Sequence, residues 1–376
     1  MAIVATDGAI PNTRIEERVT ADPMKLSVLD QSAAVTGRSE AESIRETLAL
    51  AGHCEALGYH RFWVSEHHNI PAIVGTAPEV LMGAIAATTS RIRIGSAGVM
   101  LPHYSALKVA EQFRVLDALA PGRIDLGLGR APGGDMRTAQ ALNPNAYGSA
   151  ENFPQQVRDL QAWVCAREGE GGGETHQGIH AHPHGPTAPE MWILGSSDYG
   201  AQLAAHFGLP YAFAYFFTDG QGAEQAMALY QRLYQPSSRF PTPQSTLCVW
   251  ALVADTEAQA QHQAMSRERW RVDRNRGVFG PLRSPDEVAA QGFQPADGPT
   301  LQALRERAFV GTAAQVGAQL RALAADYGLT ELVVNTWAHD PAVRRRSYAL
   351  LAQEFVLSGQ ASGMESDAAT HAAPGA

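Results

Sequence analysis

Glu66, His67 and His68 form the chemically densest stretch of the sequence. The protonation of imidazole changes near neutral pH, so a histidine that faces a ligand can donate or accept a proton. Adjacent residues on an extended chain point in opposite directions, so two neighbouring imidazoles are poorly placed to hold one metal ion. We therefore expect one histidine to face a ligand and no metal to be bound. The alternative is that both histidines only satisfy buried carbonyl groups.

A second stretch, Gly195-Ser196-Ser197, lies between an expected strand and the start of an expected helix. Free backbone N–H groups and the positive end of the helix dipole suit a phosphate there, and the two hydroxyl groups add donors. Ser197 or the following Asp198 could instead cap the helix. Arg130 follows another strand, where an unpaired guanidinium would be costly. Its partner is therefore either an anionic ligand or a carboxylate such as Asp135.

These candidate residues follow some of the eight short apolar stretches that alternate with segments of helical periodicity. Continuously apolar strands separated by helices indicate a parallel sheet that is covered on both faces. An open doubly wound sheet would show a glycine-rich fingerprint after its first strand, and SVLDQSAAVTG is not one. We therefore predict a single-domain α/β protein, a (β/α)8 TIM barrel with insertions, whose site lies at the carboxyl ends of the strands. The expected strands are Lys25–Asp30, Arg61–Val64, Ile92–Val99, Ile124–Gly129, Met191–Leu194, Tyr211–Phe217, Leu247–Ala254 and Glu331–Asn335.

The expected barrel spans residues 24–358, between an N-terminal tail, 1–23, and a C-terminal tail, 359–376, that we expect to be disordered. Two insertions, about 168–190 and 275–300, interrupt the alternation and have the length of lids or disordered excursions. The first insertion is rich in glycine and histidine, and we interpret it as a solvated loop rather than a metal site. Its histidines are His176, His180, His182 and His184.

Composition and charge narrow the class of protein. The 376 residues include 29 lysines and arginines against 38 aspartates and glutamates, a formal net charge of −9. This balance offers no basic surface for nucleic acid or for an anionic membrane. We find no apolar run long enough to cross a membrane and no signal-peptide pattern in the first residues. The three cysteines are far apart and odd in number, which is typical of a reducing compartment, so we expect a cytoplasmic protein.

Five segments carry a resemblance to a known family: LSVLDQS, RFWVSEHHN, IRIGSAGVMLPHYS, EQFRVLDALAPGRIDLGLGRAPG and LGSSDYGAQLAAHFGLP. In this order they resemble the luciferase-like flavin-dependent monooxygenases, the bacterial luciferase superfamily. The sequence is most similar to a group of bacterial monooxygenases named after an antibiotic-biosynthesis oxygenase of streptomycetes. The resemblance runs from about Met24 to Leu357 and is weak across the two insertions.

The resemblance implies a TIM barrel that binds reduced flavin mononucleotide (FMN) at its mouth. It matches Ala97 and Gly98 to a pair whose non-prolyl cis peptide forms a bulge behind the flavin ring, and it implies a mobile lid near residues 275–300. It matches Arg130 and the two serines to phosphate-binding positions, and His67 to a histidine important for catalysis. The implied cofactor-binding residues are Ala97, Gly98, Arg130, Gly195, Ser196, Ser197 and Tyr215, and the implied catalytic residues are His67 and Glu66.

The activity that the resemblance implies is oxygenation of a small organic substrate by O2 and reduced FMN. No nicotinamide fingerprint is visible, so a separate flavin reductase is the expected source of the reduced flavin. Family members pair through barrel helices, which implies a homodimer. Gly129 stands where the α subunit of bacterial luciferase has a reactive cysteine, which argues against light emission. Two alternatives stay open: hydride transfer with a deazaflavin cofactor on the same barrel, and a flavin-binding protein without turnover.

Overall fold

The computed structural model describes residues 24–131, 134–165 and 176–358. The tails expected at 1–23 and 359–376, and part of the first insertion, lie outside these residues. Eight parallel strands close into a ring in which each strand pairs with its neighbours and β9 pairs back with β1. The prediction of a (β/α)8 barrel is therefore confirmed. The ring consists of β1 Lys25–Asp30, β2 Arg61–Val64, β3 Arg93–Met100, β4 Ile124–Gly129, β5 Glu190–Gly195, β6 Tyr211–Phe213, β7 Ser245–Val253 and β9 Glu331–Asn335.

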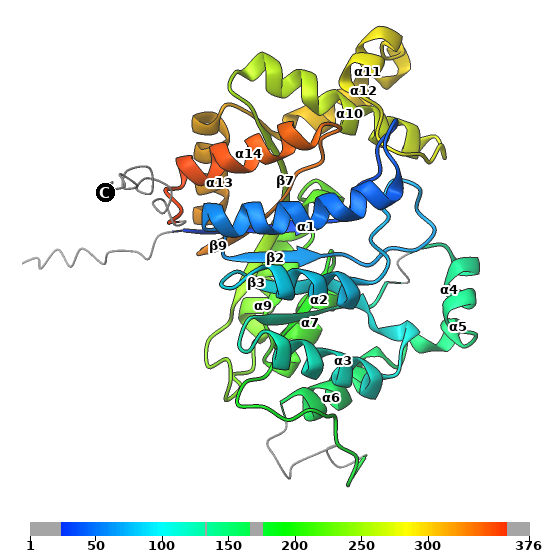
Figure 1. Cartoon of the computed structure of the whole chain (residues 1–376), viewed down its shortest axis with the longest axis vertical. Helices are drawn as coiled ribbons and strands as arrows, with labels where there is room; N and C mark the ends of the chain where they lie inside the picture. Colours follow the sequence, from blue (N-terminus) through cyan, green and yellow to red (C-terminus); the bar gives the residue numbers. More distant parts are fainter. Residues whose placement is uncertain (1–23, 132–133, 166–175, 359–376) are drawn as a thin grey trace, which may run out of the picture.

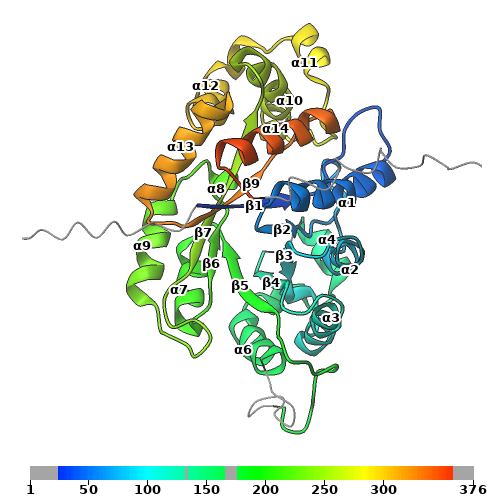
Figure 2. The same cartoon turned by 60° about the vertical axis from the view of Figure 1, so that its left-hand side comes forward.

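Helices follow the strands along the chain and surround the ring, as two views of the molecule show (Figures 1 and 2). The helices of the outer layer are α1 Glu40–Leu57, α2 Pro78–Thr88, α3 Ala106–Leu119, α6 Phe153–Val164, α7 Asp198–Phe207, α9 Ala223–Leu233, α13 Ala313–Asp326 and α14 Pro341–Glu354. The other helices are α4 Met136–Leu142, α5 Ala146–Ser149, α8 Tyr215–Thr218, α10 Glu257–Asn275, α11 Pro285–Gln291 and α12 Gly298–Glu306, with 3-10 turns η1 Leu101–His103 and η2 Pro295–Asp297. Within the described ranges, none of these helices has the length and apolar character needed to cross a membrane.

Two segments differ from the sequence-based expectation. The strand expected over 211–217 ends at Phe213, because the next residue turns and donates its backbone N–H to the Gly195 carbonyl, 2.8 Å away. The second insertion, expected to be irregular over 275–300, contains α11 and the turn η2, which leads into α12. Ser284 and Glu287 form a capping box that starts α11, with Pro285 at its first position. An additional short strand, β8 Phe309–Gly311, pairs with the end of β7 outside the ring.

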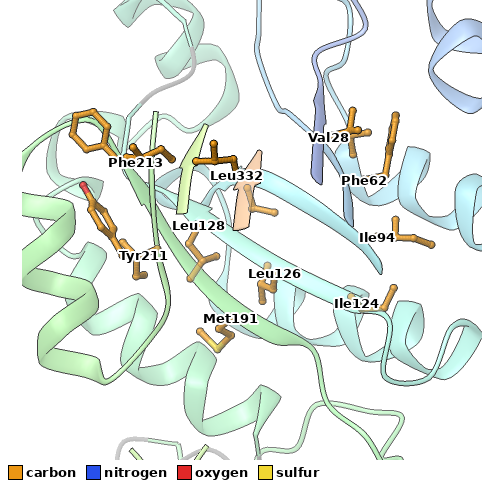
Figure 3. Close-up of a cluster of buried hydrophobic side chains, with 14 of the residues drawn as sticks. Val28, Phe62, Ile94, Ile124, Leu126, Leu128, Met191, Tyr211, Phe213 and Leu332 are labelled. Atoms are coloured by element: carbon orange, nitrogen blue, oxygen red, sulfur yellow. The ribbon is translucent and has the colours of Figure 1, made fainter. Parts of the chain in front are cut away.

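Alternate side chains of each strand point outward into the helix layer, where they form the main hydrophobic core (Figure 3). Val28, Phe62, Ile94 and Leu332 belong to this set, and each is fully buried. Removing an apolar side chain of this size from water stabilises a fold by roughly 1.5–3 kcal/mol. The helix layer and the ring are thus held together by the outward face of every strand.

The inward side chains at the amino ends of the strands form a charged network. The Arg61 guanidinium donates to Asp125 at 3.0 Å, Glu190 at 2.9 Å and Glu331 at 2.9 Å, so β2 is tied to β4, β5 and β9. Arg93 makes a second contact with Asp125. Burial alone would raise the pKa of Asp125, but the charges of Arg61 and Arg93 outweigh it and lower that pKa. The bottom of the barrel is therefore closed by ionised, mutually paired groups.

Two tryptophans fill the middle of the barrel directly above this network. Trp63 donates its indole N–H to Asp125 at 2.9 Å, Trp192 donates to Glu190 at 2.8 Å, and the ring centres lie 5.3 Å apart. Gly95 makes room for them, since a Cβ atom there would stand 2.4 Å from Trp63 Cδ1. With the bottom charged and the middle full, the open volume of the barrel is confined to its carboxyl end.

We expect Arg61→Met to lower the free energy of unfolding by about 3–5 kcal/mol, because it leaves buried carboxylates without their shared cation. Denaturant titration measures this loss. The control Arg232→Ala removes an exposed arginine of α9 and is expected to change stability by no more than about 0.5 kcal/mol. Similar small losses in both variants would show that the network does not stabilise the barrel.

Candidate active site

A cavity of about 340 Å³ opens at the carboxyl ends of the strands, within the range typical of small-molecule sites. Seven consecutive strands of the ring, β1 to β7, contribute residues to its lining. Their contributions include Gln31 after β1, His67 after β2, Gly98 within β3, Arg130 after β4, Ser196 after β5 and Phe216 after β6. We call this space the mouth cavity. Seven of the nine predicted site residues line it, namely His67, Ala97, Gly98, Arg130, Gly195, Ser196 and Ser197.

One wall of the mouth cavity is a bulge in β3. The Ala97–Gly98 peptide is cis, as the resemblance implies, and the register of β3 against β4 shifts between Ser96 and Val99. A Cβ atom at Gly98 would lie 2.4 Å from Leu194 Cδ1 and 2.7 Å from the backbone oxygen of the residue opposite on β4. The bulge therefore requires glycine, and it presents bare backbone to whatever lies in the cavity.

A second wall is polar and suited to an anion. Ser197 occupies the N-cap position of α7, but its side chain makes no capping hydrogen bond, so its hydroxyl is available to a ligand. The guanidinium of Arg130 is exposed and lies 4.0 Å from the ring centre of Tyr199. Asp135, the carboxylate that could have paired with it, instead caps α4 by accepting from the Thr138 N–H at 2.9 Å. In the described ranges Arg130 has no carboxylate partner.

His67 brings an uncharged imidazole to the cavity. Its Nδ1 lies 3.1 Å from Ser65 Oγ, and its backbone N–H donates to the Gly75 carbonyl, which fixes the residue and leaves Nε2 for a ligand. Burial is the largest cause of a lowered pKa at His67; Glu66 opposes it, the charges of His68 and Arg274 add to it, and the resulting pKa is about 4. The imidazole is therefore neutral at pH 7.

Glu66 does not line the mouth cavity, although it precedes His67. Its buried carboxylate accepts from the Met100 N–H at 2.9 Å, from the Tyr104 hydroxyl at 2.6 Å and lies 2.7 Å from His68 Nε2. It thus joins the segment after β2 to the end of β3 and to Tyr104, the residue that follows η1. The described residues contain no cluster of three or more His, Cys, Asp or Glu side chains that could hold a metal ion.

Tyr215 also lies away from the cavity lining. It is the first residue of α8, and its ring packs 6.2 Å from the ring of Phe309 on β8. The next two residues, Phe216 and Phe217, line the cavity in its place. Sequence reasoning missed them because it extended the strand to Phe217. It also missed Cys248, whose place on the inward face of β7 follows from alternation along that strand.

Known proteins match the chain over most of its length. Residues 24–331 match the family model described as luciferase-like monooxygenase. The chain belongs to this family. Protein YwcH of Bacillus subtilis is 42% identical over 337 residues, covering 88% of this chain and 99% of the relative. N-acetyl-S-alkylcysteine monooxygenase of the same organism is 34% identical, covering 89% of this chain and 99% of the relative.

The solved structure of apo-MsnO8 superposes on this luciferase-like monooxygenase with a TM-score of 0.82 and 36% identity, covering 90% of this chain and all of that one. The resemblance drawn from the sequence motifs is thereby confirmed. Family membership makes the protein a flavin-dependent monooxygenase, and the walls of the mouth cavity are its candidate active site.

The burial of His67 predicts a pH-dependent stability. Its pKa is lower in the folded chain than the ordinary 6.5, so neutral His67 contributes stability above that pH and the contribution is lost as pH falls toward about 4. We expect His67→Gln to flatten this acid-side decline, as measured by denaturant titration at several pH values. The control His206→Gln, at an exposed position of α7, should keep the wild-type decline. If both variants lose stability with falling pH as steeply as the wild type, the decline does not come from His67.

Proposed function

We propose that the mouth cavity binds reduced FMN and that the protein uses it with O2 to oxygenate a small organic substrate. The observation that carries this proposal is the meeting, in one cavity, of the glycine bulge of β3 with an anion site made by Arg130 and the start of α7. A planar ring can lie against the bare backbone of the bulge. A phosphate can bind the guanidinium, the Ser197 hydroxyl and the free N–H groups of the helix.

FMN is favoured over a deazaflavin because the described cavity lining offers this single cationic side chain, which matches one terminal phosphate. When bound, reduced flavin supplies the electrons that let O2 give one oxygen atom to the substrate and release the other as water. Neutral His67 presents Nε2 as a hydrogen-bond partner or proton acceptor beside the ring. Phe216 and Phe217 add apolar surface to the cavity wall.

The same proposal includes two partners. A separate reductase supplies the reduced flavin, since the sequence lacks a nicotinamide fingerprint.

A second copy of the chain pairs with the outer face of α2 and α3, where three large apolar side chains are exposed: Val80 by 66%, Val115 by 48% and Leu119 by 63%. Val80 lies on α2 and the other two residues lie on α3, and these two helices pack against each other. The free thiols of all three cysteines fit a reducing cytoplasm.

We expect Arg130→Ala to weaken the binding of reduced FMN roughly 30-fold, or about 2 kcal/mol, because a charge-assisted contact to the phosphate is lost. Binding of riboflavin, which lacks the phosphate, should not change. Anaerobic fluorescence titration measures both affinities, and Arg137→Ala on α4 is the matched exposed control. Equal losses for both flavins, or binding of a deazaflavin without binding of FMN, would refute the proposed cofactor site.

The proposed dimer predicts a particle of twice 40.2 kDa in light scattering after gel filtration. The double variant Val80→Glu with Leu119→Glu is expected to be a folded monomer, since it places charges in an apolar interface. The control Leu233→Glu alters an equally apolar but separate position on α9, exposed by 44%. A monomeric wild-type protein, or an unchanged dimer in the double variant, would overturn this arrangement.

A further inference from the structure

Helix α10 carries four arginines, and one of them lacks the partner that the other three have. The paired ones are Arg267 and Arg271, which share Asp219, and Arg269, which pairs with Asp273. Arg274 completes a row with Arg267 and Arg271 at positions i, i+4 and i+7, on one face of the helix. Among the described residues Arg274 has neither a carboxylate partner nor a side-chain hydrogen bond.

The surroundings of Arg274 are aromatic. Its guanidinium carbon lies 5.3 Å from the ring centre of Phe217 and 5.5 Å from that of Trp270, and the side chain is half-buried. Burial and the charge of Arg271 lower the pKa of Arg274. Trp270 in turn packs edge-on against Trp337, with ring centres 4.8 Å apart. Ring faces orient a guanidinium but do not neutralise it, so within the described part of the chain this charge has no counter-ion.

The position of Arg274 links it to the mouth cavity. Phe217, one of its two ring contacts, lines the mouth cavity. The charge of Arg274 also acts on His67, another lining residue. Phe217 lines a second cavity as well, of about 480 Å³, between α8, α10 and α12. Arg274 itself lines neither cavity, but its contact with Phe217 places its guanidinium beside a residue that lines both.

We propose that Arg274 binds a carboxylate of the substrate. The substrate is then an organic acid with an apolar arm that passes over Phe217 and brings its reacting atom into the mouth cavity near His67. This inference rests on the proposed function, in which Arg130 is occupied by the phosphate of FMN and a second anion needs a second cation. A guanidinium suits a carboxylate because it can donate two parallel hydrogen bonds. The aromatic neighbours suit the apolar arm.

The test uses 4-phenylbutanoate and its neutral amide, 4-phenylbutanamide, as probes of the full chain loaded with FMN. Binding is followed by tryptophan fluorescence, since Trp270 and Trp337 lie beside Arg274, and by inhibition of flavin-dependent O2 consumption. We expect the acid to bind at least about tenfold more tightly than the amide. Arg274→Gln should abolish this preference, and Arg274→Lys should restore part of it. The control Arg283→Gln, an arginine that pairs with Asp273, should retain it.

Three results would overturn the inference: equal binding of acid and amide, an unchanged preference in Arg274→Gln, or loss of the preference in Arg130→Gln alone. A fall in thermal stability of Arg274→Gln with an unchanged acid preference would show that this arginine only stabilises the carboxyl end of α10. Flavin titration of the same variants separates this question from the proposed function. Loss of the acid preference with unchanged FMN affinity supports the inference, whereas failure of every variant and the wild type to bind FMN refutes the proposed function itself.

Discussion

A single buried guanidinium holds the amino end of this barrel together. Arg61 reaches from β2 to carboxylates on β4, β5 and β9, and is more than nine-tenths excluded from solvent. Ionised groups persist there because they are paired with one another, and removal of the shared cation would leave the others uncompensated. The ring of strands is thus fixed from the inside at one end. The interior of the barrel is filled at that end, and the mouth cavity lies at the opposite end.

The site follows from what stands above the network. Trp63 and Trp192 fill the middle of the barrel, so the cavity has a solid floor. Above them, the bulge at Gly98 exposes backbone where a side chain would otherwise stand. The start of α7 and Arg130 add positive potential at one side, and Arg274 adds it at the edge formed by α10. A protein with a net charge of −9 therefore has, among its described residues, two arginines without a carboxylate partner in or beside the lining of the mouth cavity.

The ring of strands and the residues at its mouth could largely be predicted from the sequence, because both depend on the alternation of short apolar stretches with helical segments. All eight strands of the ring appear as apolar runs, and Arg130 and Ser197 could be placed at the mouth because they follow two of them. The bulge at Gly98 was anticipated through the family motif alone. The strand predicted over 211–217 hid the turn that brings Phe216 and Phe217 into the cavity lining, because the end of β6 is set by the start of α8 and not by a pattern of apolar residues. Ser284, Pro285 and Glu287 have the spacing of a capping box, which is the sequence signal for α11 inside the second insertion.

The importance of Arg274 could not be predicted in the same way. It is one of four arginines in α10. Arg274 differs from Arg267 and Arg271 because these two form ion pairs with Asp219, whereas Arg274 does not. Which arginines of α10 are paired depends on how the end of α8, with Asp219, packs against α10 in the folded chain. Sequence patterns report which residues can be charged, whereas the folded chain determines which charges are left for a ligand.

The most direct test of the account is a crystal structure of the protein soaked with FMN. The account predicts the phosphate within hydrogen-bond distance of the Arg130 guanidinium and the first N–H groups of α7, with the flavin ring against the Ala97–Gly98 backbone and Arg274 left free. A phosphate bound elsewhere, or a ring lying outside the mouth of the barrel, would contradict it.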